Sequence, residues 1–172
     1  MTSLDFDPNA VRFARGHAID GAVVEDGGDS LAVRRPSDNA EYAQLPIASA
    51  EMVDRAVTSA ARAFRTSAWA AGPPRDRARL LRRWADLIEA NSLELGQIEA
   101  LGSTRPIRDV LAVDIPYAAD AIRFFAEWAD KLGGDVAATR RDNLGLVIGE
   151  PYGVVAAIAP WNFPITQAVT KI

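Results

Sequence analysis

The residue best placed for chemistry in this 172-residue sequence is an asparagine, Asn162, which follows a long apolar run. The run, residues 153–159, carries no polar alternation, which is typical of a parallel strand covered on both faces. Pro160 ends the run because proline cannot donate to a central ladder, and Pro164 suits the first turn of a helix. Asn162 is therefore predicted on a strand-to-helix turn, where open α/β sheets bind ligands.

A side-chain amide on such a turn has two interpretations. It can donate a hydrogen bond to an oxygen that becomes negative during a reaction, and one such donor contributes about 3 kcal/mol in a dry site. It can also cap the helix that follows, a common use of asparagine. The spacing alone favours neither role.

The motif around Asn162 closely resembles the aldehyde dehydrogenase superfamily. The shared pattern, Gly-Val-Val-x-x-Ile-x-Pro-Trp-Asn-Phe-Pro, begins at Gly153, and the resemblance covers the chain from about Ile19 to Ile172. Supporting matches lie at residues 19–21, 35–39, 49–51, 81–86 and 124–131. The resemblance concerns the N-terminal portion of the family pattern. It implies an α/β fold in which an N-terminal β-hairpin and helices lead into the first buried parallel strand of a Rossmann-type NAD-binding domain, incomplete here.

The resemblance also implies a reaction and two catalytic residues. Aldehyde dehydrogenases bind the aldehyde covalently through a cysteine as a thiohemiacetal, transfer a hydride to NAD or NADP, and hydrolyse the thioester. By this pattern Asn162 donates to the developing oxyanion. Lys171 matches a lysine that supports the active-site water relay, although a surface lysine is the common alternative.

Further positions match the family's binding surfaces. Those that lie against the nicotinamide dinucleotide are Ile158, Ala159, Pro160 and Trp161. Phe163 and Gln167 match positions that line the aldehyde entrance. Without the resemblance, all six would be interpreted as strand end, core or helix packing. The sequence does not indicate which aldehyde is used, or whether the cofactor is NAD or NADP.

The sequence also lacks parts of the family's machinery. It contains no cysteine, so the nucleophile is not in this chain, and disulfides and Cys-based metal sites are excluded. The single histidine, His17, has no partner for a triad or a metal site. Many relatives hold a structural monovalent cation with an acidic residue, but residues 101–105 lack that carboxylate. We therefore expect no metal, and we expect the chain alone to be inactive.

The overall composition restricts the partners and the location. The net charge of −4 gives no electrostatic basis for binding nucleic acid. No apolar stretch reaches the roughly 18 residues of a membrane span, and the first residues do not resemble a signal peptide. The expectation is a cytoplasmic enzyme that acts on a small-molecule aldehyde and is a homo-oligomer, dimer or tetramer, when complete. The alternative is a non-enzymatic binding or assembly module derived from an aldehyde dehydrogenase.

Four parts of the chain are expected. Residues 1–16 form a flexible lead-in, and residues 17–134 form the hairpin and helical part of the NAD-binding domain. Residues 135–152 form the strand of an oligomerisation arm. Residues 153–172 hold the first Rossmann strand and the start of the next helix, which is truncated.

Local signals predict the individual elements. Short strands at residues 18–24 and 31–34 flank a turn cluster and are expected to pair, with a third strand at residues 42–45. A strand is also expected at residues 144–150. Residues suited to begin helices are Ser49, Pro74, Ser92 and Asp114. The first helix should end near residue 65. The last should end at Gly133-Gly134 and bury much of its surface, including Phe125, Trp128 and Leu132.

Overall fold

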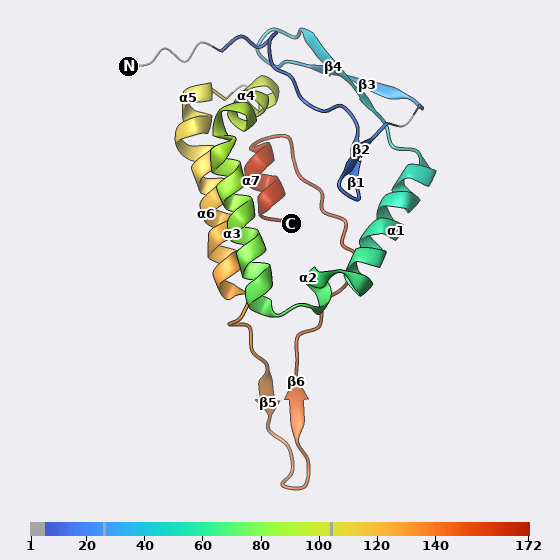
Figure 1. Cartoon of the computed structure of the whole chain (residues 1–172), viewed down its shortest axis with the longest axis vertical. Coiled ribbons are helices and arrows are strands. Elements are labelled where there is room, and N and C mark those ends of the chain that lie inside the picture. Colours follow the sequence, from blue (N-terminus) through green and yellow to red (C-terminus); the bar gives the residue numbers. More distant parts are fainter. Residues whose placement is uncertain (1–5, 26, 104) are drawn as a thin grey trace.

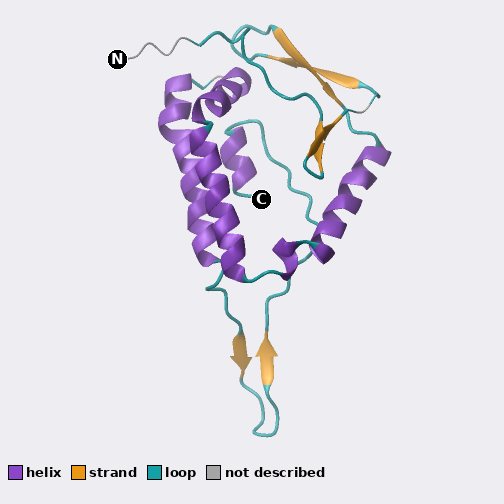
Figure 2. Ribbon diagram, viewed as in Figure 1, coloured by secondary structure: helices purple, strands orange, loops and turns teal. Residues whose placement is uncertain are grey.

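The computed structural model describes residues 6–25, 27–103 and 105–172. Two small hairpins lead into a set of helices, and a third hairpin projects away from them (Figures 1 and 2). The strands are β1 (His17–Ile19), β2 (Ala22–Val24), β3 (Ser30–Arg34), β4 (Glu41–Pro46), β5 (Asp135–Ala137) and β6 (Gly145–Val147). The helices are α1 (Ala50–Thr66), α2 (Ala68–Ala71), α3 (Pro74–Ala90), α4 (Ser92–Ser103), α5 (Ile107–Asp109), the π-helical turn η1 (Val110–Asp114), α6 (Ile115–Trp128) and α7 (Pro164–Val169).

The N-terminal strands pair differently from the prediction. β1 pairs with β2 and β3 pairs with β4, so the hairpin predicted between residues 18–24 and 31–34 is wrong. The first turn is Asp20-Gly21, with φ values of 56° and 76°. Positive φ at both turn residues suits a two-residue hairpin, which closes β1 onto β2 locally. The third predicted strand is confirmed as β4. Of the predicted lead-in, residues 1–5 lie outside the described residues.

Three of the predicted helix starts are confirmed. The Ser49 hydroxyl accepts a hydrogen bond from the Met52 amide at 3.1 Å, and α1 runs to Thr66. Such a cap satisfies one of the backbone donors that a helix leaves unpaired at its start. Pro74 begins α3 and Ser92 begins α4, as expected.

The predicted start of the last long helix is wrong. Asp114 is not a cap: its φ and ψ of −69° and −44° are helical, and helical backbone extends from Ile107 through η1 into α6. The side chain of Asp114 instead pairs with Arg105. The helix ends at Trp128, before the glycine pair, and Phe125 and Trp128 are 58% and 46% exposed. The apolar stripe predicted for this helix is therefore buried only in part.

The core lies between α3 and α6, which run side by side (Figure 1). Small side chains at Ala85, Ala118 and Ala119, each 0% exposed, allow the two helices to approach closely. Val110 of η1 and Val169 of α7 belong to the same buried cluster. The core therefore anchors α7, the helix that begins just after Asn162. None of the described helices is long and apolar enough to cross a membrane.

The predicted buried strand at residues 153–159 is not formed. The segment from β6 to α7 is irregular, and Val155 and Ile158 are 68% and 86% exposed. A strand needs a neighbour to satisfy its backbone groups, and none of the described strands lies against this segment. The strand predicted at residues 144–150 is observed only over β6, which pairs antiparallel with β5.

Candidate active site

Asn162 lies on the turn between the exposed segment and α7. Its side chain is exposed and forms no hydrogen bond with any described residue. The cap position of α7 is occupied by Phe163, whose own side chain makes no capping hydrogen bond. The amide therefore remains available to a ligand and does not serve as a helix cap.

The residue after Asn162 has an unusual backbone conformation. Phe163 is left-handed, with φ 63° and ψ 55°. That region is sterically unfavourable for a bulky side chain, and residues held in it often lie at functional sites. The Phe163 ring lies under the guanidinium of Arg105, with the guanidinium carbon 4.5 Å from the ring centroid. A cation over an aromatic face attracts the ring and so favours this conformation.

Arg105 is fixed by an ion pair with a buried carboxylate. Its Nε donates to Asp114 Oδ2 at 2.5 Å, and its Nη2 donates to Asp114 Oδ1 at 3.1 Å. The Asp114 side chain is 4% exposed and that of Arg105 is 29% exposed. Two parallel hydrogen bonds to one carboxylate set the plane of the guanidinium. The contact with Phe163 therefore comes from a group that is itself held in place.

A second buried carboxylate contacts the start of α7. The Ile165 amide donates to Glu99 Oε2 at 3.0 Å. Glu99 is 5% exposed, and its Oε1 has no hydrogen-bond partner among the described residues. Burial raises the pKa of the Glu99 carboxyl, and the charge of Asp114 raises it further; the Ile165 amide and Arg105 act in the opposite direction.

The other two predicted residues, Gln167 on α7 and Lys171 just beyond its end, contact one another. Lys171 Nζ donates to Gln167 Oε1 at 2.7 Å and to the Gln167 carbonyl at 3.4 Å. Gln167 is half-buried, whereas Lys171 is exposed. The pairing ties the Lys171 side chain, two residues past the end of α7, back to Gln167 within the helix.

The four predicted cofactor residues form an exposed edge. Ile158 and Trp161 are 86% and 78% exposed, and Ala159 and Pro160 between them are also exposed. A largely apolar groove of 940 Å³ is lined by Phe64, Leu132 and residues of the segment up to Gly153, and by none of these four residues. Large exposed apolar surface of this kind often marks a binding site.

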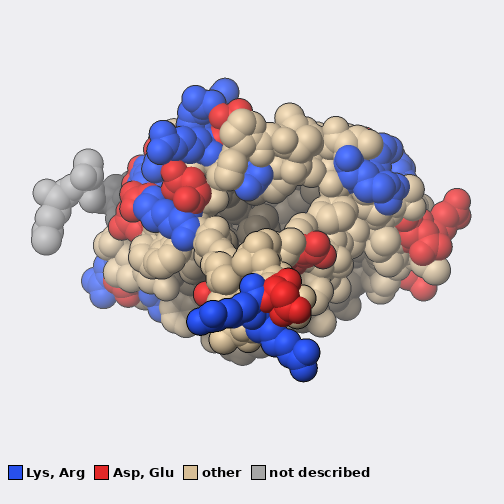
Figure 3. Space-filling view, turned by 90° about the horizontal axis from the view of Figure 1, so that it is seen from below, with Lys and Arg blue, Asp and Glu red and all other residues tan. Residues whose placement is uncertain are grey.

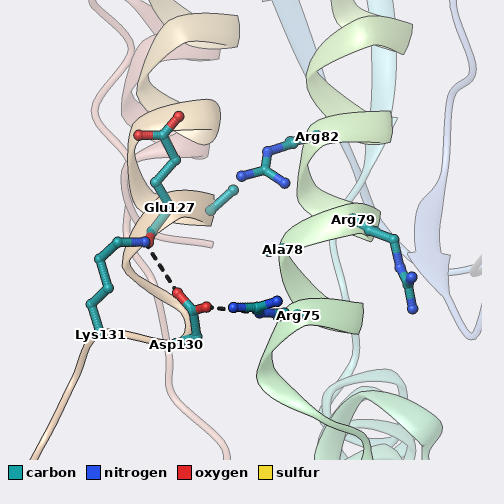
Figure 4. Close-up of a pocket in the computed structure, with 8 residues that line it drawn as sticks. Arg75, Ala78, Arg79, Arg82, Glu127, Asp130 and Lys131 are labelled. Carbon is teal, nitrogen blue, oxygen red and sulfur yellow. Dashed lines mark hydrogen bonds and ion pairs between the residues drawn. The ribbon is translucent and has the colours of Figure 1, made fainter.

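A grouping of charged residues in the described part of the chain could also bind a ligand or a metal ion. On the face seen from below, acidic and basic side chains are mixed at the left and at the bottom, and a basic and an acidic cluster lie apart at the right (Figure 3). A pocket of 320 Å³ between α3 and the end of α6 is rich in arginine. There, Asp130 accepts from both Arg75 and Lys131 at 3.1 Å, while Arg79 points away (Figure 4). Within the described ranges no three His, Cys, Asp or Glu side chains are grouped to hold a metal ion.

Comparison with known proteins identifies the family. The sequence profile described as "Aldehyde dehydrogenase family" matches residues 23–172. The chain belongs to the aldehyde dehydrogenase family. Among aldehyde dehydrogenase sequences, it is 40% identical over 137 residues to the NADP/NAD-dependent aldehyde dehydrogenase PuuC of Escherichia coli, covering 80% of this chain and 28% of that protein. It is 38% identical over 155 residues to the aminoacetaldehyde dehydrogenase of Pseudomonas aeruginosa, covering 90% of this chain and 31% of that protein.

Solved aldehyde dehydrogenases share the fold of this chain. The structure of P. syringae AldA indole-3-acetaldehyde dehydrogenase, a C302A mutant in complex with NAD⁺ and IAA, superposes with a TM-score of 0.86 and 39% identity. The match covers 94% of this chain and 33% of that one. The predicted resemblance and fold class, the N-terminal part of an aldehyde dehydrogenase, are therefore confirmed. The chain spans about a third of the length of these relatives.

Proposed function

We propose that this chain contributes the oxyanion donor and one edge of the cofactor site to an oxidoreductase that converts an aldehyde to a carboxylic acid with NAD or NADP. The observation that carries the proposal is the Asn162 amide, which is exposed, forms no hydrogen bond with a described residue and stands at the start of an anchored helix. A neutral amide donor stabilises an oxygen that gains charge without requiring a proton to move.

Each site residue has a defined task in this proposal. The Asn162 amide donates to the aldehyde oxygen as it becomes negative. The exposed edge from Ile158 to Trp161 packs against the dinucleotide, which when bound supplies the hydride acceptor. Phe163 and Gln167 line the aldehyde entrance, and Lys171, paired with Gln167, helps to order the water that completes the carboxylic acid.

The substrate proposed is an aldehyde as a chemical class. Two relatives of similar identity are named for aminoacetaldehyde and for indole-3-acetaldehyde, which differ in charge and size. Gln167 gives the proposed entrance some polar character. One such residue suits both types of aldehyde.

We also propose that the complete protein is a homo-oligomer, dimer or tetramer, assembled through the β5–β6 arm. The arm projects beyond the helices (Figure 1). Three of its apolar side chains, Val136, Leu146 and Ile148, are 71%, 62% and 67% exposed. An exposed apolar hairpin without lysine is a ready template for pairing with another copy.

The absence of cysteine favours a second function for the 172 residues by themselves. Without a thiolate there is no nucleophile to bind the aldehyde covalently. The isolated chain would then bind or assemble without catalysing. We propose that it does not oxidise aldehydes until it is joined to the remaining two-thirds of the family's length.

A chimaera tests the enzymatic function against the non-enzymatic one. In it, this chain replaces the matching third of E. coli PuuC, and aldehyde-dependent NAD(P)H formation is measured. Asn162→Ala should lower kcat by about 10²–10³-fold, as loss of one oxyanion donor does elsewhere, and leave the Kd for NAD unchanged. Glu94→Ala, at an exposed position of α4 outside the arm, is the control.

The outcomes separate the two functions. The isolated chain should give no turnover in the same assay. An active chimaera whose Asn162→Ala variant keeps its full kcat would overturn the oxyanion role. A well-folded chimaera that binds NAD but never turns over would favour the non-enzymatic function.

A further inference from the structure

The turn that carries Asn162 holds more strain than a simple strand-to-helix connection requires. Phe163 lies in the left-handed region with φ 63°. A non-glycine residue there is strained and persists only where its surroundings enforce the conformation. Glycine would adopt the same conformation without that strain. The contacts around Phe163 should therefore explain why the conformation is kept.

One such contact comes from Arg105, which leads into the helical run from α5 to α6. Its guanidinium covers the Phe163 ring at 4.5 Å, and its two bonds to Asp114 prevent it from turning away. Asp114 is the last residue of the π-helical turn η1. Such turns shift the residues that follow them around the helix axis and are common at functional sites.

The other contact comes from Glu99 on α4. Ile165 is the second residue of α7, so its amide has no acceptor within the helix. Glu99 Oε2 supplies that acceptor, while Glu99 Oε1 remains buried without a described partner. A carboxylate so poorly satisfied is expensive to bury, and a glutamine or leucine would fill the same volume at lower cost. Its presence points to a task at the start of α7.

We propose that Glu99 and Arg105 are positioning residues for the Asn162 amide. Glu99 fixes the backbone two residues beyond Phe163, and Arg105 fixes the Phe163 ring. Together they hold Phe163 left-handed and so set the direction in which the preceding amide points. Neither residue touches the substrate in this arrangement. The consequence for turnover rests on the function proposed above for Asn162, whereas the structural part does not.

The structural part is tested by NMR on the 172-residue chain. The amide shift of Ile165 should follow the titration of the Glu99 carboxyl, with a midpoint above the ordinary value of 4.5 because burial disfavours the charged form. The charged groups that act on Glu99 are Arg105 and Asp114. Glu99→Gln should abolish the titration of the Ile165 amide, and Glu94→Gln, exposed on the same helix, should leave it unchanged.

The conformation of Phe163 gives a second structural readout. Its backbone coupling constant and Cα shift report the sign of φ. Arg105→Lys keeps a charge beside Asp114 but loses the planar guanidinium, so Phe163 should leave the left-handed region in part of the population. A wild-type chain in which φ of Phe163 is negative, or in which the Ile165 amide does not titrate, would overturn the proposal.

The functional part is tested in the PuuC chimaera. Glu99→Gln and Arg105→Lys should each lower kcat by about 10–10²-fold, because small misplacements of a catalytic group have effects of that size, and leave KM for NAD within twofold. Phe163→Gly removes the left-handed strain, so Arg105→Lys should cause no further loss in that background. The controls are Glu94→Gln and Arg123→Lys. Arg123 pairs with Glu89, whose side chain is 48% exposed.

The two proposals fail in different ways. If Asn162→Ala is harmless, the oxyanion role fails while the NMR readouts still decide how the turn is held. If Asn162→Ala impairs turnover but Glu99→Gln and Arg105→Lys do not, only the positioning role fails. The positioning role would also fail if Arg105→Lys lowered kcat equally with and without Phe163→Gly. A loss that does not depend on residue 163 would come from a general loss of stability.

Discussion

The Arg105–Asp114 pair allows a stability prediction that separates a buried ion pair from an exposed one. Arg105→Gln removes both hydrogen bonds to Asp114, a carboxylate that is 4% exposed. Removing one partner of a buried pair costs about 3–5 kcal/mol, because the remaining charge is left unpaired. Arg105 is itself 29% exposed, so water can reach part of the vacated space. We therefore expect about 3 kcal/mol, the lower end of that range.

Urea denaturation of the 172-residue chain followed by circular dichroism gives the free energy of unfolding. For a chain of 172 residues, about 3 kcal/mol corresponds to a Tm lower by roughly 6–12 °C. Arg123→Gln is the control, since Asp86 and Glu89 opposite it are 68% and 48% exposed. Exposed pairs contribute about 0–1 kcal/mol, so this variant should unfold nearly as the wild type does.

A double variant decides whether the cost arises from the unpaired charge. Asp114→Asn removes that charge, so Arg105→Gln combined with Asp114→Asn should be more stable than Arg105→Gln alone. Two outcomes would refute the reasoning. One is an Arg105→Gln variant no less stable than Arg123→Gln. The other is strict additivity of the two changes, because contacting residues should be coupled.

Two further predictions concern Glu99 and the arm. The folded-state pKa of Glu99 is raised above 4.5, so the folded state binds the Glu99 proton more tightly than the unfolded state does. The stability gained from that proton is present below pH 4.5 and is lost as pH rises through the raised pKa. Glu99→Gln should therefore flatten the change in unfolding free energy above pH 4.5, and an unaltered pH profile would contradict the buried carboxyl. For the arm, the double variant Leu146→Glu with Ile148→Glu should shift the chimaera toward monomers in sedimentation velocity. Leu132→Glu, at a residue that is 80% exposed outside the arm, should not. A parent chimaera that is already monomeric would contradict the assembly proposal.

Elements defined by local chemistry were predictable from the sequence. Ser49 and Pro74 mark helix starts through a hydroxyl acceptor and a fixed φ, and neither depends on distant contacts. The hairpin error has a local cause as well. Asp20-Gly21 is a strong two-residue turn signal, but the longer turn cluster at residues 25–29 also suggests a hairpin turn and so predicts the wrong partner strands. The Asp114 error arose because a residue suited to a cap can equally be a buried ion-pair partner.

The site was predictable only in part. The types and spacing of residues 158–164 indicated the turn and its amide. Glu99 and Arg105 were missed as site residues, because they lie about 60 residues earlier in the chain and only tertiary packing brings them to α7. A weak signal existed, since Glu99 sits among apolar residues of α4 and a charge in such a place needs a partner. The apolar run at residues 153–159 predicts a strand buried on both faces. None of the described strands lies against it, so the segment stays exposed.

The two sides of Asn162 are therefore fixed by different means. After it, Phe163, Ile165 and Val169 are held by Arg105, Glu99 and the helical core. Before it, the apolar segment makes no ladder with a described strand, although its residues would suit a buried one. The direction of the amide can thus be set within these 172 residues, whereas the edge proposed to meet the dinucleotide needs neighbouring strands to become rigid. Strand partners should consequently change nucleotide binding more than they change the backbone at Phe163.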